Sequence, residues 1–405
     1  MPNTQTWTTP AIRSLKSGEI SSSTFAGRPD RRSKVKWLVP LNKLTKLQTD
    51  VIDKIVELND ENHWVSGYAG SGKTIVLTHA IARVASENPR DSIGFITYTH
   101  ALKDLVESGL SPAVRKRVEI NTVDKFCGSP KTYDHLFVDE VQDLKDWQID
   151  IVLEHSNHIV FAGDPDQSIH TNRVDPKDLN TLLLRPKKHM LNEIHRLSEN
   201  SFDIATSIYP EAKMTSGASL QDAIDNEAKH LWADSRKEET FRIYDEAVQL
   251  SEPGSPSAIL LPEHNLIYQF ASLVAEIQGL SQPPKPVPIP PKMGHDYTAF
   301  NAFFKKAKEP LMFLGSGFGS FSESDTKPLV YILTYHSSKG LDFVNTFLPY
   351  LDEKTKIKQN YNTDDQGRRL FFVATTRSRW QQHFSHTTGK HEYLDLIPDH
   401  YFDEL

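Results

Sequence analysis

Residues 66–74 read SGYAGSGKT, which fits the phosphate-binding pattern G-x-x-x-x-G-K-[ST]. Such a loop needs glycines because backbone N–H groups must close around phosphate oxygens, and a Cβ atom would obstruct them. A helix that begins after the loop presents its N-terminus to the same anion. Lys73 would place a charge at the β- and γ-phosphates, and the Thr74 hydroxyl would be a ligand of Mg²⁺. The expected nucleotide-binding residues of this loop are Gly67, Gly70, Ser71, Gly72, Lys73 and Thr74.

Two adjacent carboxylates follow an apolar run in FVDEVQD (137–143). Asp139 would hold Mg²⁺, directly or through water, and Glu140 would orient and deprotonate an attacking water molecule. Transfer of a phosphoryl group to water requires both parts. A charged loop without chemistry is the alternative, but it explains less well why the pair comes at the end of a strand.

A glutamine and two arginines complete the set of candidate catalytic residues. AGDPDQSI (162–169) ends the next apolar run, and the Gln167 amide would contact both a γ-phosphate and the attacking water. Asp164 would hold this loop in place or support the metal. An arginine that reaches across a cleft to the γ-phosphate can contribute about 10³–10⁵ in rate. Arg196 in LNEIHRLS and Arg377 in VATTRSR are the candidates, although each is an ordinary arginine when taken alone.

Short apolar runs and helical patterns alternate around these side chains. The stretch 41–58 has apolar residues at helical spacing and should lead to a short strand near His63–Ser66. Helical patterns follow the phosphate-binding loop and cover ALKDLVESG, which Gly109 would cap. The expected buried strands are SIGFITYT (92–99), HLFVDE (135–140) and HIVFAGD (158–164). This alternation predicts a parallel sheet flanked by helices, with ligands at the carboxyl ends of its strands.

A second set of strands and helices follows. SAILLP (257–262) and VYILTY (330–335) should be buried strands, RRLFFVATTRSR (368–379) a helix, and WQQHFSHT (380–387) a late strand. Between them, SQPPKPVPIPPK (281–292) holds six prolines, so it cannot be a helix or a central strand. We expect an extended connector there, with a docking site for a polyproline-binding partner as the alternative.

Composition narrows the class of protein. The chain has 405 residues, 38% hydrophobic content and no apolar run long enough for a membrane span. MPNTQTWTTP lacks the order of a signal peptide, and the single cysteine, Cys127, fits a reducing compartment, so we expect a cytoplasmic location. The net charge of −7 argues against nucleic-acid binding through bulk charge. Any such site must be a local groove; RPDRRSKVKW (28–37) is either part of one or a solvated arm.

The ordered set of motifs resembles superfamily 1 helicases of the UvrD/Rep type, in a compact form that lacks their large insertions. The resemblance covers most of the chain, from about Leu41 to Arg379. It implies two RecA-like P-loop NTPase domains of the α/β class, with an ATP cleft between their parallel sheets. The motifs that carry it are LTKLQTDVI, GYAGSGKT, FITYTHALKDL, NTVDKF, FVDEVQDL, AGDPDQSI, LNEIHR, YILTYHSSKGLDF and RRLFFVATTRSR.

This resemblance assigns further roles around the nucleotide. Gln48 matches the glutamine that reads adenine, and His195 stands where the family often has a base-stacking tyrosine. Gly340 and Asp342 match a pair of family residues that lie near the sugar and phosphates of the nucleotide. Arg196 and Arg377 match the family's two γ-phosphate arginines.

The resemblance also implies a track for single-stranded nucleic acid. Tyr98 matches an aromatic residue that stacks on a base, and such stacking contributes about 1–3 kcal/mol per base. His170 and Asn172 replace a tyrosine and a tryptophan of the family, so one stacking platform is missing. Asp124 replaces a histidine beside the track. The expected track residues are Thr97, Tyr98, His100, Thr122, His170, Asn172, Thr334, His336 and Ser337.

Three segments follow from these assignments. Residues 1–40 would be a flexible arm, 41–185 the first RecA-like domain, and 186–405 the second, with a reduced insertion around 281–325. We expect an ATPase that uses ATP and Mg²⁺, depends on nucleic acid, and translocates on single-stranded DNA in the 3′ to 5′ direction; the missing insertions leave open whether it also unwinds a duplex. The alternative is a sensor that regulates a partner nuclease or other effector, as in some bacterial anti-phage systems. An inert scaffold is the third interpretation.

Overall fold

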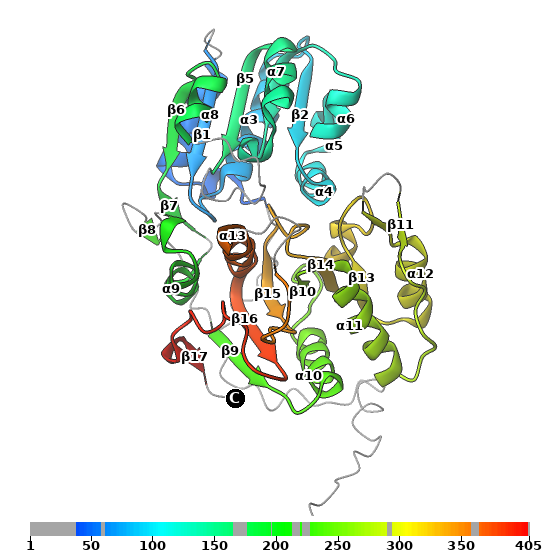
Figure 1. Ribbon diagram of the computed structural model, residues 1–405. Helices are drawn as coiled ribbons and strands as arrows, with labels where there is room; N and C mark the ends of the chain where they lie inside the picture. The colour runs from blue at the N-terminus through cyan, green and yellow to red at the C-terminus, as the bar shows by residue number, and fades with distance from the viewer. Residues whose placement is uncertain are drawn as a thin grey trace, which may run out of the picture. The chain divides into compact units, whose positions relative to one another are not determined.

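Two sheets of parallel strands flanked by helices dominate the computed structural model (Figure 1). The expected α/β class is therefore confirmed. The structure describes residues 38–57, 61–164, 176–195, 197–212, 219–220, 227–289, 294–357 and 364–403. Among these residues, no helix is long and apolar enough to cross a membrane.

The first sheet has six strands in the order β3-β2-β4-β5-β1-β6, and all of its pairs are parallel. With its helices it forms what we call the first lobe. The strands are β1 (His63–Gly67), β2 (Ile93–Thr97), β3 (Val118–Thr122), β4 (Tyr133–Val138), β5 (Ser156–Gly163) and β6 (Lys187–Leu191). The helices are α2 (Lys46–Val56), α3 (Lys73–Glu87), α4 (His100–Gly109), α5 (Pro112–Arg115), α6 (Val123–Gly128), α7 (Asp146–Glu154) and α8 (Pro176–Leu182). Strand β6 follows the expected boundary at 185/186 yet pairs with β1, so the first sheet continues to Leu191.

Local capping explains where two of these helices begin and end. Helix α2 begins at Lys46 rather than near Leu41, because Thr45 and Gln48 form a capping box at its N-terminus. The expected cap at Gly109 is wrong. Gly109 is the last helical residue of α4, the cap position belongs to the extended Leu110, and Gly109 has no positive φ.

The second sheet has seven strands in the order β13-β14-β10-β15-β16-β9-β17, again with parallel pairs throughout. We call this sheet and its helices the second lobe. The strands are β9 (Glu227–Trp232), β10 (Ser257–Leu261), β13 (Leu311–Phe313), β14 (Val330–Thr334), β15 (Phe343–Leu348), β16 (Ser378–His386) and β17 (Phe402–Asp403). The helices are α9 (Glu199–Ile208), α10 (Arg236–Gln249), α11 (His264–Ile277), α12 (Thr298–Ala307) and α13 (Asp364–Thr375). Two small pairs also occur, β7 (Glu193–Ile194) with β8 (Ser219–Leu220) and β11 (Val287–Pro288) with β12 (His295–Asp296).

The helix expected over 368–379 is wrong at its C-terminal end. Helix α13 ends at Thr375 and β16 already begins at Ser378. The hydroxyl groups of Thr375 and Thr376 donate to the carbonyl oxygens of Phe372 and Val373, both at 2.9 Å. Such side chains satisfy carbonyl groups in the last turn and so favour its termination. Arg377 consequently lies in the short turn between helix and strand.

The proline-rich stretch is a packed connector over its described part. Pro283 and Pro286 are buried, whereas the residues between and after them are exposed. This three-residue period is that of a polyproline II helix with one face packed. The Tyr268 hydroxyl of α11 donates to the Pro283 carbonyl at 3.4 Å. The prolines on the packed face therefore hold the connector against the second lobe.

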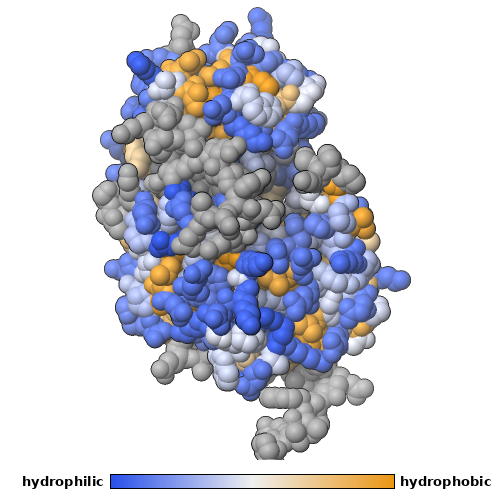
Figure 2. Space-filling model, viewed as in Figure 1, coloured by the Kyte–Doolittle hydropathy of each residue, from blue (hydrophilic) through white to orange (hydrophobic). Residues whose placement is uncertain are grey.

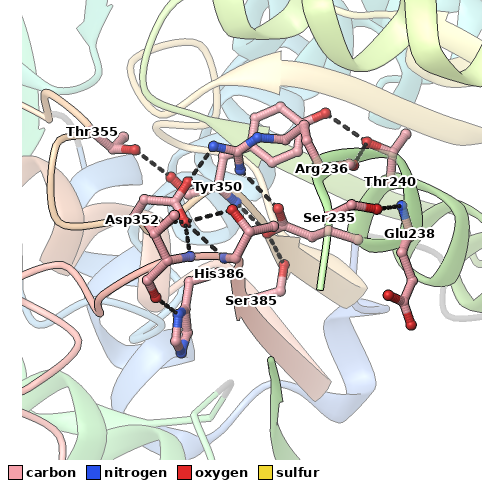
Figure 3. A network of polar contacts seen from close by, with 12 residues as sticks. Ser235, Arg236, Glu238, Thr240, Tyr350, Asp352, Thr355, Ser385 and His386 are labelled. Atoms are coloured by element: carbon pink, nitrogen blue, oxygen red, sulfur yellow. Dashed lines mark hydrogen bonds and ion pairs between the residues drawn. The ribbon is translucent and has the colours of Figure 1, made fainter. Parts of the chain in front are cut away.

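A network of ion pairs and hydrogen bonds joins α10 to the ends of β15 and β16 (Figure 3). Arg236 donates to Glu239 at 2.7 Å and also pairs with Asp352. The Asp352 carboxylate accepts from the backbone N–H groups of Thr387 and Thr388 at 2.7 and 3.0 Å. These donors keep the pKa of Asp352 below its ordinary value despite its burial. We call Arg236, Glu239 and Asp352 the α10 clamp.

Buried hydrophobic side chains connect the two lobes. One cluster includes Leu102 and Leu105 of α4 together with Leu314 and Leu341 from the second lobe. On the face seen in Figure 2, hydrophilic side chains predominate and hydrophobic ones form separate patches. The apolar contact between the lobes therefore brings their strand ends together around a shared cavity.

Candidate nucleotide site

A cavity of about 350 Å³ lies where residues of both lobes meet. Its lining includes ten of the residues singled out from the sequence and also Arg379, which sequence reasoning did not select. The described residues Gly67, Ser71 and Asp139 were also expected here but do not line the cavity. The ten are Gln48, Gly70, Gly72, Lys73, Thr74, Glu140, His195, Gly340, Asp342 and Arg377.

Two glycines of the phosphate-binding loop are required by close neighbours. A Cβ atom on Gly67 would lie 2.5 Å from the Leu191 carbonyl oxygen, because β6 runs alongside. Gly72 has a φ of +87°, and a Cβ atom there would lie 2.7 Å from the Gln48 amide nitrogen. Any other residue at Gly72 would therefore be strained and would push the Gln48 side chain aside.

Lys73 and Gln48 both hold the loop in place. The Lys73 ammonium donates to the carbonyl oxygens of Gly67 and Tyr68 at 2.8 and 3.1 Å. The Gln48 amide donates to the Ser71 carbonyl at 3.1 Å, while its oxygen accepts from the Thr45 N–H at 3.1 Å. Because Gln48 belongs to the helix cap, it links the start of α2 to the loop that would surround the phosphates.

Thr74 and Asp139 lie together, as a magnesium site requires. The Thr74 hydroxyl donates to the Asp139 carboxylate at 2.7 Å, and Asp139 is 1% exposed. Burial, and then the neighbouring Glu140, raise the pKa of Asp139. Hydroxyl and carboxylate oxygens are ligands that Mg²⁺ prefers, and a cation would relieve this buried negative charge. Within the described ranges no group of three or more His, Cys, Asp or Glu side chains could hold a metal, so Mg²⁺ would take its other ligands from phosphate and water.

Glu140 is held by a glutamine that sequence reasoning missed. The backbone of Glu140 is left-handed, with a φ of 56°, which is uncommon for a residue with a Cβ atom. The Gln142 amide donates to Glu140 Oε2 at 2.5 Å, and its oxygen accepts from the Asp164 N–H at 3.1 Å. A Cβ atom on Gly163 would lie 2.1 Å from Gln142 Oε1, so this glycine makes room for the link. In the sequence, only the position of Gln142 two residues after Glu140 hinted at this link.

Lys339 of the second lobe was also missed. Its ammonium lies 2.5 Å from Asp143 Oδ2 and 3.7 Å from Glu140 Oε2, and the residue is 1% exposed. Burial acts to raise the pKa of Glu140, but Lys339, Lys73, the Gln142 hydrogen bond and Arg377 outweigh it and lower that pKa. The two adjacent carboxylates therefore differ in pKa: that of Asp139 is raised and that of Glu140 is lowered, with Lys339 as the main positive neighbour of Glu140.

Arg377 is buried and fixed by its own turn. Its Nε donates to the Val373 carbonyl at 2.7 Å, and one Nη donates to the Leu341 carbonyl at 3.1 Å. Because the guanidinium also lines the cavity, its place beside Glu140 is set by backbone groups of the second lobe. Arg379 of the same segment donates to the Asp342 carboxylate at 2.5 Å, so Asp342 lines the cavity as half of an ion pair.

His195 reaches the cavity from the segment that follows β6. Its backbone N–H donates to the Gly70 carbonyl oxygen at 3.1 Å, which ties this segment to the phosphate-binding loop. Its ring lies 3.7 Å from the Glu193 carboxylate and lines the cavity. His195 is therefore part of the cavity wall.

The expected track residues of the first lobe differ in exposure. Thr97 and Thr122 are register partners in β2 and β3, and both are buried, with Thr97 at 0% exposed. Tyr98 is half-buried against the cluster beneath it, and burial raises the pKa of its hydroxyl. His100 begins α4. Of these residues, Tyr98 and His100 have the more accessible side chains.

A loop of the second lobe connects expected track residues of both lobes. A Cβ atom on Gly317 would lie 3.6 Å from His100, and one on Gly315 would lie 2.8 Å from the Ser337 hydroxyl. The Thr334 hydroxyl donates to that of Ser337 at 3.0 Å. His336 lies in the same turn as Ser337. The expected residues Gln167, His170, Asn172 and Arg196 lie outside the described residues.

Comparisons with known proteins found one family match and one curated relative. Residues 50–173 match the family described as AAA domain (AAA_19). Over 274 residues the chain is 26% identical to a protein of Acanthamoeba polyphaga mimivirus described as "Putative ATP-dependent DNA helicase R568". Both matches support the resemblance to a helicase-type ATPase. The match covers 64% of this chain and 35% of that relative, so the chain spans about a third of the relative's length.

Solved structures of viral helicases are distant neighbours. A crystal structure of Arterivirus nonstructural protein 10 (helicase) covers 86% of this chain and 64% of its own, at 14% identity and a TM-score of 0.42. The structure of the PRRSV helicase covers 82% of this chain and 54% of its own, also at 14% identity and a TM-score of 0.42. At these scores nothing about the site is carried over from them.

Proposed function

We propose that the chain hydrolyses ATP in the cavity between its lobes and that single-stranded nucleic acid stimulates this reaction. The observation that carries the proposal is the shared cavity, in which Lys73, Thr74 and Glu140 of the first lobe meet Arg377 of the second. These four side chain types are those that hold phosphates, hold Mg²⁺, activate water and neutralise the transition state. The helicase-like relative and the AAA domain match support the same class of reaction.

Each of these residues has a defined part in the proposed reaction. Lys73 exchanges its carbonyl partners for phosphate oxygens, and Glu140 orients and deprotonates the attacking water. Arg377 stabilises the charge that develops on the γ-phosphate. Thr74 and Asp139 would hold Mg²⁺, which neutralises phosphate charge. Gln167 and Arg196 are proposed as the γ-phosphate sensor and the second arginine finger.

The remaining residues singled out in the cavity lining are proposed to bind the nucleoside. The Gln48 amide, held between the helix cap and Ser71, would read adenine, and the His195 ring would stack on it. Gly340 and Asp342 would lie beside the sugar and phosphates, with Arg379 holding the Asp342 carboxylate in place.

A single strand of DNA is the proposed effector, in keeping with the description of the mimivirus relative as a DNA helicase. It would contact Tyr98 and His100 of the first lobe and His336 and Ser337 of the second. Because the loop at Gly315 and Gly317 touches residues of both groups, opening and closing of the cavity would move the two contacts relative to each other. Translocation in the 3′ to 5′ direction is part of this proposal.

Steady-state phosphate release tests the proposal. Wild-type protein with Mg²⁺ and ATP should hydrolyse ATP, whereas Lys73→Ala should lose phosphate binding and activity. Glu140→Gln should lower kcat by about 10²–10⁴-fold and retain nucleotide affinity, because it removes only the base. Activity that survives in both variants would place hydrolysis elsewhere and end the proposal.

A sensor that regulates a partner nuclease is the second candidate. One observation favours it: between β2 and β4 the chain holds only α4, α5, β3 and α6, in a stretch described without gaps. No helical subdomain is inserted in this described stretch, so the stretch itself offers none that could engage a duplex. Displacement of a protein block from the end of a bound single strand separates the two functions. Movement supports a motor, and intact ATPase without movement supports the sensor.

A further inference from the structure

Lys339 is a buried lysine whose carboxylate partners belong to the opposite lobe. Its ammonium lies 2.5 Å from Asp143 and 3.7 Å from Glu140, and only 1% of the residue is exposed. Removing an ammonium group from water is unfavourable unless it is paired. Both partners lie on the segment after β4 in the first lobe, so this pairing exists only while the lobes are in contact.

The turn that carries Lys339 is seated firmly on the first lobe. After β14 the chain turns back, with the Ser338 N–H donating to the Thr334 carbonyl at 3.0 Å and the Lys339 N–H to the His336 carbonyl at 3.2 Å. Gly340 has a φ of +78°, and a Cβ atom there would lie 3.0 Å from Leu102 of α4. The glycine thus lets the turn approach the first lobe closely, and the preceding lysine is aimed at the acidic segment.

Glu140 needs such support because its own segment is strained. Its left-handed backbone has a φ of 56°, and Gln142 of the same segment holds Oε2 at 2.5 Å. The Lys339 ammonium approaches the same oxygen from the other lobe. Asp143 anchors that ammonium, so the Glu140 carboxylate lies between a hydrogen-bond donor of its own lobe and a positive charge of the other lobe.

We propose that Lys339 is a positioning residue that orients Glu140 toward the attacking water when the lobes close. This inference rests on the proposed function, because it assigns Glu140 the role of base. Through Lys339, the catalytic carboxylate would acquire its working orientation only in the closed cavity. A purely structural ion pair would instead affect stability or nucleotide affinity and leave kcat unchanged.

Kinetics of full-length variants separate these roles. Lys339→Met should lower kcat about 10²-fold, the size of effect expected for a misplaced catalytic group, with the Kd of a fluorescent ATP analogue within about threefold of wild type. Lys339→Arg should recover part of the loss because it keeps the charge. Lys327→Met is the matched control: Lys327 pairs with Glu323 in the same lobe and is 42% exposed, so kcat should not change.

A double variant keeps the test decisive if Lys339→Met leaves Asp143 unpaired and unfolds the protein. Lys339→Met with Asp143→Asn removes both charges, and its kcat should be no lower than that of Asp143→Asn alone, since the pair acts as one unit. If the wild type is active and the kcat of the double variant is within about threefold of the wild-type kcat, the inference is overturned. It is also overturned if Lys339→Met loses as much nucleotide affinity as kcat. Wild type without ATPase under any condition overturns the proposed function itself, and the inference with it.

Discussion

At the scale of single residues, the orientation of Glu140 depends on side chains outside the phosphate-binding loop. Gln142 donates to its carboxylate at 2.5 Å and accepts from the Asp164 N–H at 3.1 Å, so one amide joins the acidic segment to the end of β5. The glycine at 163 leaves space for that amide. Changes at these neighbours should therefore affect the chemical step more than nucleotide binding.

Replacement of Gln142 tests this dependence. Gln142→Ala should lower kcat about tenfold with little change in nucleotide affinity, because a hydrogen bond to a charged group contributes about 1.5–3 kcal/mol. Steady-state kinetics and binding of a fluorescent ATP analogue measure the two effects. Gln148→Ala is the control: Gln148 is also buried, caps α7 through the Lys145 N–H, and lies outside the cavity lining. Equal kinetic losses in both variants would contradict the special role of Gln142.

Sequence alone identifies the residues whose neighbours are close in the chain. The phosphate-binding loop and the Asp139–Glu140 pair are recognisable because their chemistry is written in consecutive positions. The partnership of Lys339 with Asp143 is not, because 196 positions separate them and only the packing of two lobes brings them together. Arg379 was passed over because its partner Asp342 lies 37 positions away, on a different segment of the second lobe.

At the scale of elements, the apolar runs each marked a strand, but strands without such a run, for example β3 and β6, were not predicted, and helix ends were predicted poorly. Buried parallel strands are continuous apolar runs, which a sequence displays directly. Helix ends depend instead on single side chains such as the Thr45 cap and the Thr375 hydroxyl, whose hydrogen bonds appear only in three dimensions. The ion pairs of the α10 clamp could not be predicted from the sequence either, since its members come from separate parts of the chain.

Stability should depend on the α10 clamp. Arg236→Met should lower the free energy of unfolding by about 2 kcal/mol, because Glu239 and Asp352 would lose their charged donor while remaining largely buried. Urea unfolding with a fluorescence readout measures the change. Arg242→Met is the control: Arg242 pairs with Glu238 on the same helix and is 51% exposed, so it should alter stability by less than about 0.5 kcal/mol. A clamp variant as stable as this control would contradict the assignment.

A row of histidines crosses four neighbouring strands of the first sheet. His63 and His189 lie 2.8 Å apart on β1 and β6, and His135 and His158 lie 3.4 Å apart on β4 and β5. Burial, then the charge of neighbouring groups, lowers the pKa of His63, His158 and His189 to about 4. The folded protein therefore favours the neutral imidazoles.

These pKa values predict acid sensitivity of the first lobe. The unfolded chain takes up protons near the ordinary histidine pKa of 6.5, and the folded chain only near 4, so stability is full above pH 6.5 and is lost as pH falls toward 4. Each such histidine contributes a slope of about 1.4 kcal/mol per pH unit in this window. As the pH is lowered from 6.5 to 4, the urea concentration at the unfolding midpoint should decrease less steeply for His158→Gln than for wild type. Identical slopes would contradict the prediction.

At the scale of the whole molecule, the site exists because two sheets place their strand ends at one cavity. Sequence predicted that both sheets are parallel and in what order their motifs occur. It did not predict that Gly340 would pack on Leu102, or that the hydrophobic cluster would run from α4 into the second lobe. Those contacts depend on shape rather than on motif, and they decide which side chains line the cavity.

The most direct test of the account is the steady-state ATPase rate as a function of added single-stranded oligonucleotide. With purified wild type, Mg²⁺ and saturating ATP, the rate should rise to a plateau as the strand is added, and a duplex of the same length should stimulate less. Glu140→Gln should remain at its low rate throughout. A wild-type rate that stays flat with single-stranded DNA and RNA alike would contradict the claim that this cavity is coupled to a bound strand.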